Sequence, residues 1–341
     1  MKNAVIIVNY NQKELLQKCL TSLFVQKYDD FTVFVVDNGS KDGSVNMVKR
    51  NFSYVDVVEM GYNSGFCKAN NVGIKKAIDK GCENIIFLNN DTEVDENFLE
   101  KLVNCVDSEK NIDMVAPKIL MHSDKSIIDS TGIIITPDGM ALNRCVDKRS
   151  DCVCARDMKE VFCPTGAAAL YSVRLLEDIK QNGMYFDEDF AYYLEDVDMG
   201  WRARLRGWKC FYTPLSIVYH HKNATAGARS KFVAFYSNRN NFYNIIKNYP
   251  LTHACKAFFL AFFKYPYLTW CNINGKGVVN KFNENTSFVD LFVVTICGWK
   301  DVFINLPKFY KKRRYIQKRK KEVDVKAWIN DFGVGFFESK K

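Results

Sequence analysis

The feature that most constrains the fold is a regular alternation of short apolar runs and amphipathic segments over residues 4–88. The apolar runs have the length of buried strands, and the segments between them carry apolar residues at helical spacing. Alternating strands and helices imply a parallel sheet with right-handed crossovers. We therefore predict an α/β fold with a mostly parallel central sheet flanked by helices. The predicted strands are 4–8, 31–36, 55–58 and 85–88, and the predicted helices are 13–26, 43–51 and 66–78.

The last of these strands runs directly into a polar patch, Asn89-Asn90-Asp91-Thr92-Glu93. In open α/β sheets, ligands bind just outside the carboxyl ends of the strands. A carboxylate at Asp91 can hold a divalent cation against a diphosphate, and such an oxygen-rich site suits Mg²⁺ or Mn²⁺ better than Zn²⁺. The alternative is that Asp91 caps a turn before a helix predicted at 96–106.

A second acidic residue, Asp37, ends the second predicted strand and is followed by Asn38-Gly39-Ser40. A carboxylate at a strand end can accept hydrogen bonds from a nucleotide base or from ribose hydroxyls. The alternative is a turn and helix cap, because Asp, Asn, Gly and Ser are typical turn residues. Neither a G-x-G-x-x-G nor a Walker A motif follows, so the usual NAD and ATP signatures are absent.

The densest carboxylate cluster is formed by three of the four residues from Glu195 to Asp198. On a helix, Glu195 and Asp198 share a face, whereas Asp196 points elsewhere. Like charges this close raise one another's pKa, which suits a general base. The alternative is a solvated helix start whose acids pair with Arg202 and Arg204.

Two adjacent histidines, His220 and His221, follow an apolar strand end. A neutral imidazole at this position can complete the coordination of a cation together with Asp91. The alternative is that both histidines have a structural or surface role.

The chain has twelve cysteines, but none forms a C-x-x-C pair. The closest pair is Cys152 and Cys154, with Cys145 and Cys163 nearby. The apolar run near the N-terminus is too short for a secretory signal. We therefore predict a cytoplasmic protein with reduced thiols and no cysteine metal site.

Taken together, seven short motifs occur in an order that resembles the family 2 glycosyltransferases of the GT-A fold, especially their bacterial rhamnosyltransferase-like branch. The resemblance covers about residues 3–245. The motifs are Val8-Asn9-Tyr10-Asn11, Val36-Asp37-Asn38-Gly39-Ser40, Asn63-Ser64-Gly65-Phe66, Leu88-Asn89-Asn90-Asp91, Gly166-Ala167, Glu195-Asp196-Val197-Asp198 and His220.

The resemblance implies roles for individual residues. Asp37 would bind the nucleotide base, and Asn9, Asn63, Asn89 and Asn90 would complete the nucleotide site. Asn89 and Asp91 occupy the position of the family's DxD-type motif, so Asp91 would bind Mg²⁺ or Mn²⁺. His220 would be a second metal ligand or a diphosphate contact, with His221 as the alternative. Asp196 would be the general base, with Glu195 as the less favoured choice.

The resemblance also implies an activity. Such an enzyme would move rhamnose or another hexose from a dTDP-, UDP- or GDP-sugar to a saccharide acceptor, lipid-linked in many cases, with inversion at the anomeric carbon. The setting would be the synthesis of bacterial surface polysaccharide. Two alternatives stay open: a non-catalytic saccharide-binding or scaffold protein on the same fold, and a nucleotidyltransferase.

The predicted organisation has three parts: a nucleotide-sugar-binding half (1–107), an acceptor-binding and catalytic half (108–230), and a helical, aromatic and basic region (231–341). Residues 307–321 hold nine basic residues and no acid, so they account for the whole net charge of +9. A local basic stretch does not indicate nucleic-acid binding. We expect either a peripheral anchor at the inner face of the plasma membrane or a helical appendage that contacts a second copy.

Overall fold

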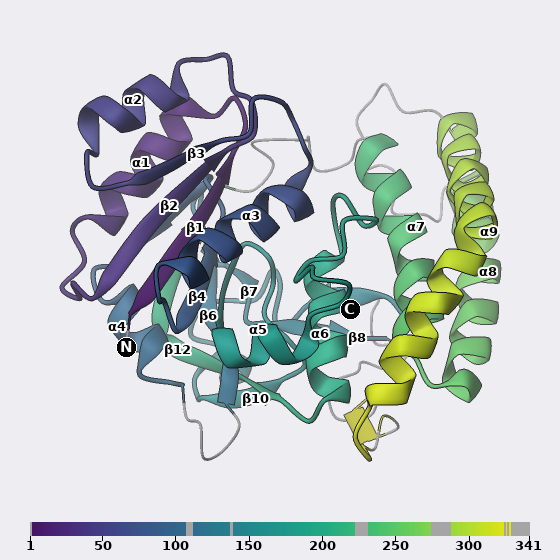
Figure 1. The fold of residues 1–341 in the computed structure, drawn as a ribbon. Coiled ribbons are helices and arrows are strands. Elements are labelled where there is room, and N and C mark those ends of the chain that lie inside the picture. Colours follow the sequence, from purple (N-terminus) through teal and green to yellow (C-terminus); the bar gives the residue numbers. More distant parts are fainter. Residues whose placement is uncertain are drawn as a thin grey trace. The chain divides into compact units, whose positions relative to one another are not determined.

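The computed structural model of the protein describes residues 2–106, 112–136, 139–221, 231–273 and 288–323, together with 325, 327 and 328. Within these ranges the chain forms two compact units, coloured along the sequence in Figure 1. The first unit draws on residues 1–134, 143–191 and 195–222, and the second on residues 135–142, 192–194 and 223–341. The boundaries predicted at 107–108 and 230–231 fall on or beside residues outside the described ranges.

The first unit begins with four parallel strands in the order β4-β1-β2-β3, which confirms the predicted α/β alternation. Helices connect these strands, as a right-handed parallel sheet requires. The strands are β1 (Asn3–Asn9), β2 (Phe31–Asp37), β3 (Asp56–Glu59) and β4 (Asn84–Leu88), and the helices are α1 (Lys13–Leu23), α2 (Ser44–Asn51) and α3 (Phe66–Asp79).

The two faces of this sheet bury alternate residues, because successive side chains on a strand point to opposite sides. One face carries Val5, Val35 and Ile86 in a cluster with buried residues of α1, α2 and α4 (Phe98–Val103). On the other face, Gly73 of α3 packs so closely that an added Cβ would lie 2.7 Å from Ile6. Figure 1 shows α1 and α2 together on one side of these strands and α3 on the other.

The sheet then continues in mixed order as β10-β12-β6-β11-β4. Strand β11 runs antiparallel to both β4 and β6, whereas β12 runs parallel to β6. Strand β12 ends at His220, beside β5, so the polar loop after β4 lies next to the histidine pair. The strands are β5 (Thr92–Val94), β6 (Ile112–Met121), β7 (Ile128–Ser130), β8 (Ile133–Ile135), β9 (Ala141–Asn143), β10 (Lys159–Val161), β11 (Ala168–Ser172) and β12 (Lys209–His220).

The chain after β6 is less regular. Residues 127–135 form two short strands, because Gly132 separates them with a φ of 109°. Residues 139–160 contain β9 and the 3-10 helix Val153–Ala155 and run into β10. Two helices follow, α5 (Val173–Ile179) and α6 (Glu195–Leu205).

The second unit is helical, as predicted for the C-terminal region, and consists mainly of α7 (Lys231–Asn248), α8 (Leu251–Ile273) and α9 (Phe288–Arg319). Tyr243 of α7 stacks on Phe309 of α9 with ring centroids 3.7 Å apart. Arg313 of α9 donates hydrogen bonds to the carbonyls of Ile246 and Tyr249 at the end of α7. Among the described helices, none is both long enough and apolar enough to span a bilayer.

The prediction of uniformly reduced thiols is wrong for this structure, in which a disulfide joins Cys145 and Cys154. The chain reverses here because Cys145 and Asp147 both adopt positive φ angles, 58° and 62°. Sequence spacing alone does not show such a reversal, since it depends on backbone angles that non-glycine residues rarely adopt.

Candidate active site

The carboxyl ends of β1, β2 and β4 are tied together by buried amide side chains. Asn90 donates a hydrogen bond of 2.8 Å from Nδ2 to Asn9 Oδ1. Asn9 in turn directs its Nδ2 to Ser40 Oγ at 3.2 Å and to Asp37 Oδ1 at 3.5 Å. Asn9, Asp37 and Asn90 are all buried. The structure thus brings together three of the residues predicted for the nucleotide site.

Asp37 supports its own turn. Its Oδ2 accepts hydrogen bonds from the backbone N–H groups of Gly39 (3.1 Å) and Ser40 (2.9 Å). Gly39 is required there, because its φ is +83° and an added Cβ would lie 2.7 Å from the backbone of Tyr62. The turn role is therefore present, and a carboxylate has further lone pairs with which Oδ1 can accept a ligand donor.

Asn38 connects this turn to the segment at 63–65. Its Nδ2 donates to Asn63 Oδ1 at 3.0 Å, and its Oδ1 accepts from both the backbone N–H and the hydroxyl of Ser64 at 2.8 Å. Asn63 also accepts from the N–H of Gly65 at 3.1 Å. Sequence reasoning did not assign this bridging role to Asn38, because an Asn in a turn carries no signature of its distant partner.

Asp91 and His220 lie together, as predicted. His220 Nε2 is 3.3 Å from Asp91 Oδ1, and its Nδ1 is 2.7 Å from Asp129 Oδ2 on β7. Burial lowers the pKa of His220, but hydrogen bonds to Asp129 and Asp91 outweigh it and raise the pKa to about 9. Without a ligand, the imidazolium therefore balances two nearby carboxylates. No local pattern in the sequence indicates a role for Asp129, which lies on a strand only three residues long.

The donor atoms of Asp91 and His220 fit a divalent cation. Two cis ligands at about 2.1 Å from an octahedral ion lie roughly 3 Å apart, close to the 3.3 Å between these atoms. Asp129 holds the other imidazole nitrogen, which is the usual way a histidine ligand is oriented. Asn89 forms its described contacts through its backbone, since its carbonyl accepts a hydrogen bond of 2.6 Å from Thr92 Oγ1.

His221 faces a different carboxylate. Adjacent residues on a strand point to opposite faces, and His221 Nε2 lies 2.9 Å from Glu93 Oε1. His122 reaches the same oxygen at 3.1 Å and stacks on His221 with ring centroids 3.6 Å apart. Of the two histidines, His220 is therefore the one beside Asp91.

The pair Glu195 and Asp196 begins α6 beside the loop at Gly166. Asp196 Oδ2 accepts a hydrogen bond of 2.7 Å from the N–H of Gly166, and Oδ1 accepts one of 2.8 Å from the N–H of Val197. Burial raises the pKa of Asp196, although these two hydrogen bonds oppose the shift. Burial and the charge of Asp196 raise the pKa of Glu195 to about 8.

Within the described residues, the buried Oε2 of Glu195 has no hydrogen-bond partner. An ionised carboxylate left unpaired in a buried position is costly, so the neutral form is favoured. The two backbone donors at Asp196 favour its ionised form, and Glu195 has no comparable donor at Oε2. Asp196 has the environment of a base, whereas Glu195 does not.

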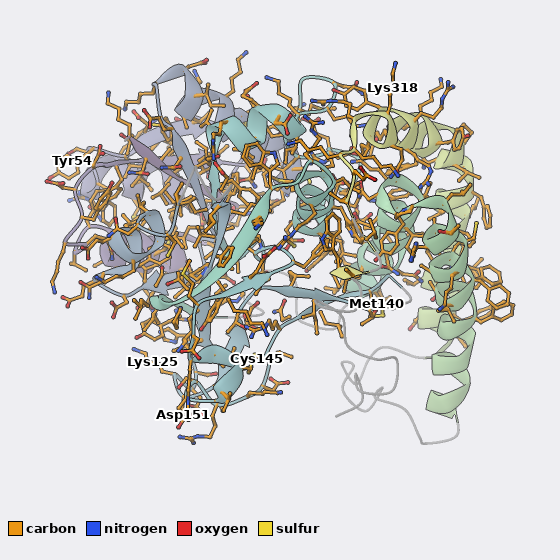
Figure 2. All side chains as sticks on the ribbon, turned by 90° about the horizontal axis from the view of Figure 1, so that it is seen from below. Tyr54, Lys125, Met140, Cys145, Asp151 and Lys318 are labelled. Atoms are coloured by element: carbon orange, nitrogen blue, oxygen red, sulfur yellow. A yellow bond between two sulfur atoms is a disulfide. The ribbon has the colours of Figure 1, made fainter. Side chains whose placement is uncertain are left out.

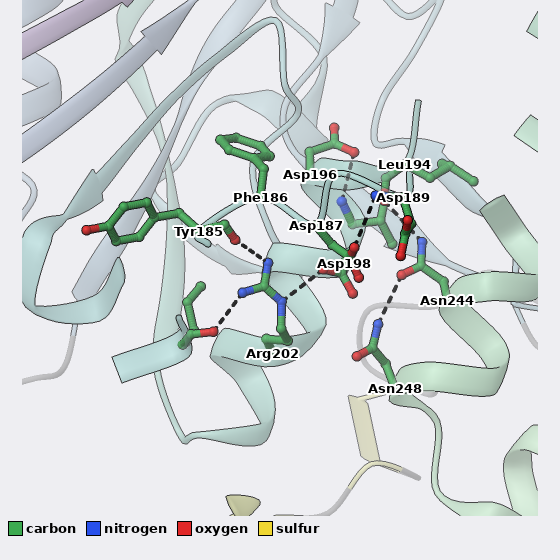
Figure 3. Close-up of polar contacts among 12 residues, drawn as sticks. Tyr185, Phe186, Asp187, Asp189, Leu194, Asp196, Asp198, Arg202, Asn244 and Asn248 are labelled. Carbon is green, nitrogen blue, oxygen red and sulfur yellow. Dashed lines mark hydrogen bonds and ion pairs between the residues drawn. The ribbon is translucent and has the colours of Figure 1, made fainter. Parts of the chain in front are cut away.

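Asp198 is structural. Its Oδ2 pairs with Arg202 Nε at 2.9 Å, and the same guanidinium donates to the carbonyls of Ile179 and Tyr185, as Figure 3 shows. The predicted pairing of the acids with arginine is thus confirmed for Arg202. It is wrong for Arg204, whose guanidinium pairs with Glu160 and donates to backbone carbonyls near β10.

The segment before Glu195 has an unusual backbone, with positive φ at Ala191, Tyr193 and Leu194. Residues 192–194 belong to the second unit, where Asn240 of α7 donates hydrogen bonds of 2.8 Å to the carbonyls of both Tyr192 and Tyr193. Asn244 donates similarly to Leu194 at 3.1 Å (Figure 3). Such strain persists only where surrounding contacts hold it, so these asparagines fix the chain that leads directly into Glu195 and Asp196.

One short loop lies between the segment that carries Asp91 and the start of α6 at Asp196. Asn89 donates its backbone N–H to the carbonyl of Ala167 at 2.9 Å, and the preceding residue, Gly166, donates to Asp196. The loop at 166–167 therefore contacts both the segment that carries Asp91 and the carboxylate at the start of α6.

Comparisons with known proteins agree with this chemistry. The family model described as Glycosyl transferase family 2 matches residues 4–179. Poly-beta-1,6-N-acetyl-D-glucosamine synthase of Staphylococcus aureus is 24% identical over 219 residues, covering 63% of this chain and 48% of the relative. The chain thus spans about half the length of this relative. The dTDP-rhamnosyl transferase RfbF of Shigella flexneri is 32% identical over 126 residues, covering 36% of this chain and 39% of the relative.

Solved structures show the same fold at low identity. Residues 1–349 of Staphylococcus aureus TarS, in complex with UDP-GlcNAc, match with a TM-score of 0.55 and 18% identity, covering 95% of this chain and 94% of that one. The mannosyltransferase PcManGT from Pyrobaculum calidifontis, in complex with GDP-Man and Mn²⁺, matches with a TM-score of 0.52 and 16% identity, covering 93% and 85%.

Proposed function

Because the chain belongs to glycosyl transferase family 2, we propose that it transfers a hexose from a nucleoside diphosphate sugar to a saccharide acceptor with inversion at the anomeric carbon. This proposal rests on one observation: the first unit contains both candidate cation ligands and a candidate base. Asp91 and His220 offer ligands for a cation, and Asp196 offers a base held by two backbone N–H groups.

On the donor side, the side chains of Asn9, Asp37 and Asn90 form a hydrogen-bonded cluster at the strand ends, where the nucleotide would bind. These side chains hydrogen-bond one another or Ser40, so they lose little conformational freedom when a nucleotide binds. Asp91 and His220 would hold Mg²⁺ or Mn²⁺, whose charge stabilises the departing nucleoside diphosphate. Support for a divalent metal comes from the Mn²⁺ in the PcManGT complex.

On the acceptor side, Asp196 takes the proton of the acceptor hydroxyl as that oxygen attacks the anomeric carbon. The C–O bond to the sugar forms as the bond to the diphosphate breaks, so a single in-line displacement inverts the configuration. Glu195 stays protonated beside it and adds no competing charge. The Asp198–Arg202 pair keeps the first turn of α6 in place.

The donor sugar is proposed as rhamnose or another hexose. A rhamnosyl donor is supported by the relative named dTDP-rhamnosyl transferase, and an N-acetylated hexose by the relative named as a poly-N-acetylglucosamine synthase and by TarS, solved with UDP-GlcNAc. One named relative is a polysaccharide synthase and the other is a rhamnosyl transferase. We therefore place the reaction in bacterial surface polysaccharide synthesis, with a saccharide, lipid-linked in this proposal, as acceptor.

A peripheral membrane position at the cytoplasmic leaflet is supported by one face of α9. Exposed apolar residues recur on it at helical spacing and give way to exposed basic residues further along. Apolar side chains followed by basic ones suit the surface of an anionic leaflet. A contact with a second copy of the chain is the alternative. The residues are Val289, Phe292, Val293, Ile296, Phe303, Ile304 and Tyr310, then Lys311, Arg314 and Lys318.

The experiment that tests the proposal is a donor panel. The purified chain is mixed with UDP-, GDP- and dTDP-sugars, with and without Mn²⁺, and the nucleotide products are separated by chromatography. A glycosyltransferase releases nucleoside diphosphate from one donor class, in a cation-dependent way. A parallel mixture contains a nucleoside triphosphate and a hexose 1-phosphate, from which a nucleotidyltransferase would release inorganic diphosphate. Saccharide binding without turnover in either mixture would indicate a scaffold.

A further inference from the structure

Three cysteines converge at one edge of the first unit, outside the candidate active site. We call Cys145, Cys152 and Cys154 the thiol cluster. Their sulfur atoms all lie within 4.8 Å of one another, and Cys152 Sγ is 2.8 Å from Cys154 Sγ. Cys145, labelled in Figure 2, follows directly on Arg144, and a disulfide joins it to Cys154.

The backbone around the cluster is built to bring these sulfurs together. Positive φ angles at Cys145 and Asp147 turn the chain, and a 3-10 helix at Val153–Ala155 returns it. The N–H of Cys152 donates to the carbonyl of Arg149 at 3.0 Å. Arg144 Nη2 donates to the carbonyl of Cys154 at 2.6 Å. A simple disulfide needs two of these sulfurs and gives no reason for the third to lie beside them.

We propose that the thiol cluster, in its reduced form, is a zinc site. Zinc prefers thiolates in a tetrahedral arrangement, where Zn–S bonds of about 2.3 Å place the sulfurs ~3.8 Å apart. All three sulfurs already lie within 4.8 Å of one another. The disulfide and the 2.8 Å between Cys152 and Cys154 are shorter than the zinc spacing, so the sulfurs must move apart after reduction for zinc to bind. The hard cation proposed at Asp91 prefers oxygen ligands, so the two sites select different metals.

The charges near the thiol cluster also favour zinc binding. Zn²⁺ with three thiolates carries one net negative charge. The cavity of about 550 Å³ beside Cys152 and Cys154 is also lined by three basic residues, Arg144, Lys148 and Lys159, and by one acidic residue, Asp157, so the lining carries a net positive charge that offsets the charge of the site. The cavity leaves the fourth tetrahedral position accessible to a further ligand.

Zinc binding and the disulfide exclude each other. A dithiol reductant closes to its own cyclic disulfide, and its two electrons and two protons leave Cys145 and Cys154 as thiols. One Zn²⁺ then binds the three sulfurs and releases three protons. Backbone hydrogen bonds pair residues 147–150 with residues 126–128, at the start of the strand that carries Asp129. Asp129 contacts His220. A bound metal would therefore stabilise the segment that positions the partner of His220.

The test uses the full chain, reduced with a dithiol and separated from it without oxygen. Titration with Co²⁺ should produce the thiolate-to-cobalt absorption band and the visible bands of a tetrahedral ion at one equivalent, and Zn²⁺ should remove them. C145S, C152S and C154S should each lose the band, whereas C255S, at an exposed cysteine of α8, should keep it.

A second measurement avoids any dependence on the folding of variants. In the unsubstituted reduced chain, one equivalent of Zn²⁺ should slow alkylation of Cys145, Cys152 and Cys154 at least tenfold, mapped by peptide mass spectrometry, and leave Cys255 and Cys297 unchanged. No metal uptake by the reduced chain, or equal alkylation of the three cysteines with and without Zn²⁺, would overturn the proposal.

Discussion

The carboxylate of Asp196 accepts a hydrogen bond of 2.7 Å from the backbone N–H of Gly166. The next residue, Ala167, accepts one from the backbone of Asn89. A backbone donor stabilises the ionised form of a carboxylate, and it cannot be removed by a side-chain change at position 166. The loop therefore holds the proposed base in a fixed place relative to the segment that carries Asp91.

The first prediction concerns Asp196. Asp196→Asn keeps the size of the side chain and removes the base, so we expect kcat to fall by about 10²–10⁴-fold while donor affinity stays the same. The measurement is steady-state transfer together with nucleotide-sugar binding by calorimetry.

Glu195→Gln is the matched control for this change. Because the pKa of Glu195 is raised to about 8, the substitution exchanges one neutral side chain for another at pH 7. We expect kcat to fall less than about tenfold, short of the range for losing a general base. If Glu195→Gln were the more damaging of the two, the base would be Glu195 instead.

The second prediction is a loss of stability with rising pH. Between the ordinary pKa of Glu195 and about 8, the folded protein keeps a proton that the unfolded chain has lost. The free energy of unfolding therefore decreases as pH rises through this window, by a few kcal/mol at most. Denaturant unfolding at pH 6 and pH 8.5 should show a smaller decrease for Glu195→Gln than for the unsubstituted chain. Parallel pH profiles for the two proteins would contradict the assignment.

The third prediction concerns the cation pair. Asp91→Asn removes a charged ligand, so the Mn²⁺ concentration needed for half-maximal activity should rise about 10–100-fold, and chelation with EDTA should abolish transfer by the unsubstituted chain. Glu93→Gln is the control, because Glu93 contacts His221 and His122 and not His220. Equal effects of the two substitutions would argue against a cation at Asp91.

Sequence reasoning located the parts of the site that follow from strand ends. Asp37, Asp91 and His220 each stand where a predicted strand stops, and the rule that ligands bind at strand ends predicts that they lie close together. Asp129 was missed for a physical reason. It lies on a strand of three residues and acts through its contact with His220, which is distant in sequence, so it leaves no local pattern.

The approach of the cysteines in the thiol cluster could not be predicted from local sequence either. Spacing alone argued against a pairing of Cys145 with Cys154. Two residues with positive φ reverse the chain between them, and no propensity for a non-glycine residue predicts that conformation. The mixed order of the sheet beyond β4 was also outside the reach of periodicity, because an apolar run does not reveal the direction in which its strand will pair.

The fourth prediction tests whether hydrogen bonds from α7 position residues 192–194. Asn240→Ala removes two hydrogen bonds and leaves the carbonyls of Tyr192 and Tyr193 without that donor. We expect the free energy of unfolding to fall by about 1–3 kcal/mol and kcat to fall with it, because this segment leads into Glu195 and Asp196. Asn305→Ala is the control, since among the residues that the structure describes its amide donates within α9, to Asp301. Unchanged kcat in a destabilised Asn240→Ala protein would show that the segment does not position the base.

The fifth prediction concerns the exposed face of α9. Each basic residue near an anionic leaflet contributes about 1 kcal/mol, so replacing Lys311, Arg314 and Lys318 by alanine should weaken binding to phosphatidylserine vesicles by roughly 100-fold. A control replaces three exposed lysines of the first unit, Lys2, Lys75 and Lys76, and should leave vesicle binding intact. Co-sedimentation measures both. If the same face instead contacts a second copy, vesicle binding will be insensitive to these changes, and Phe303→Ser with Ile304→Ser will convert a dimer to a monomer in analytical ultracentrifugation.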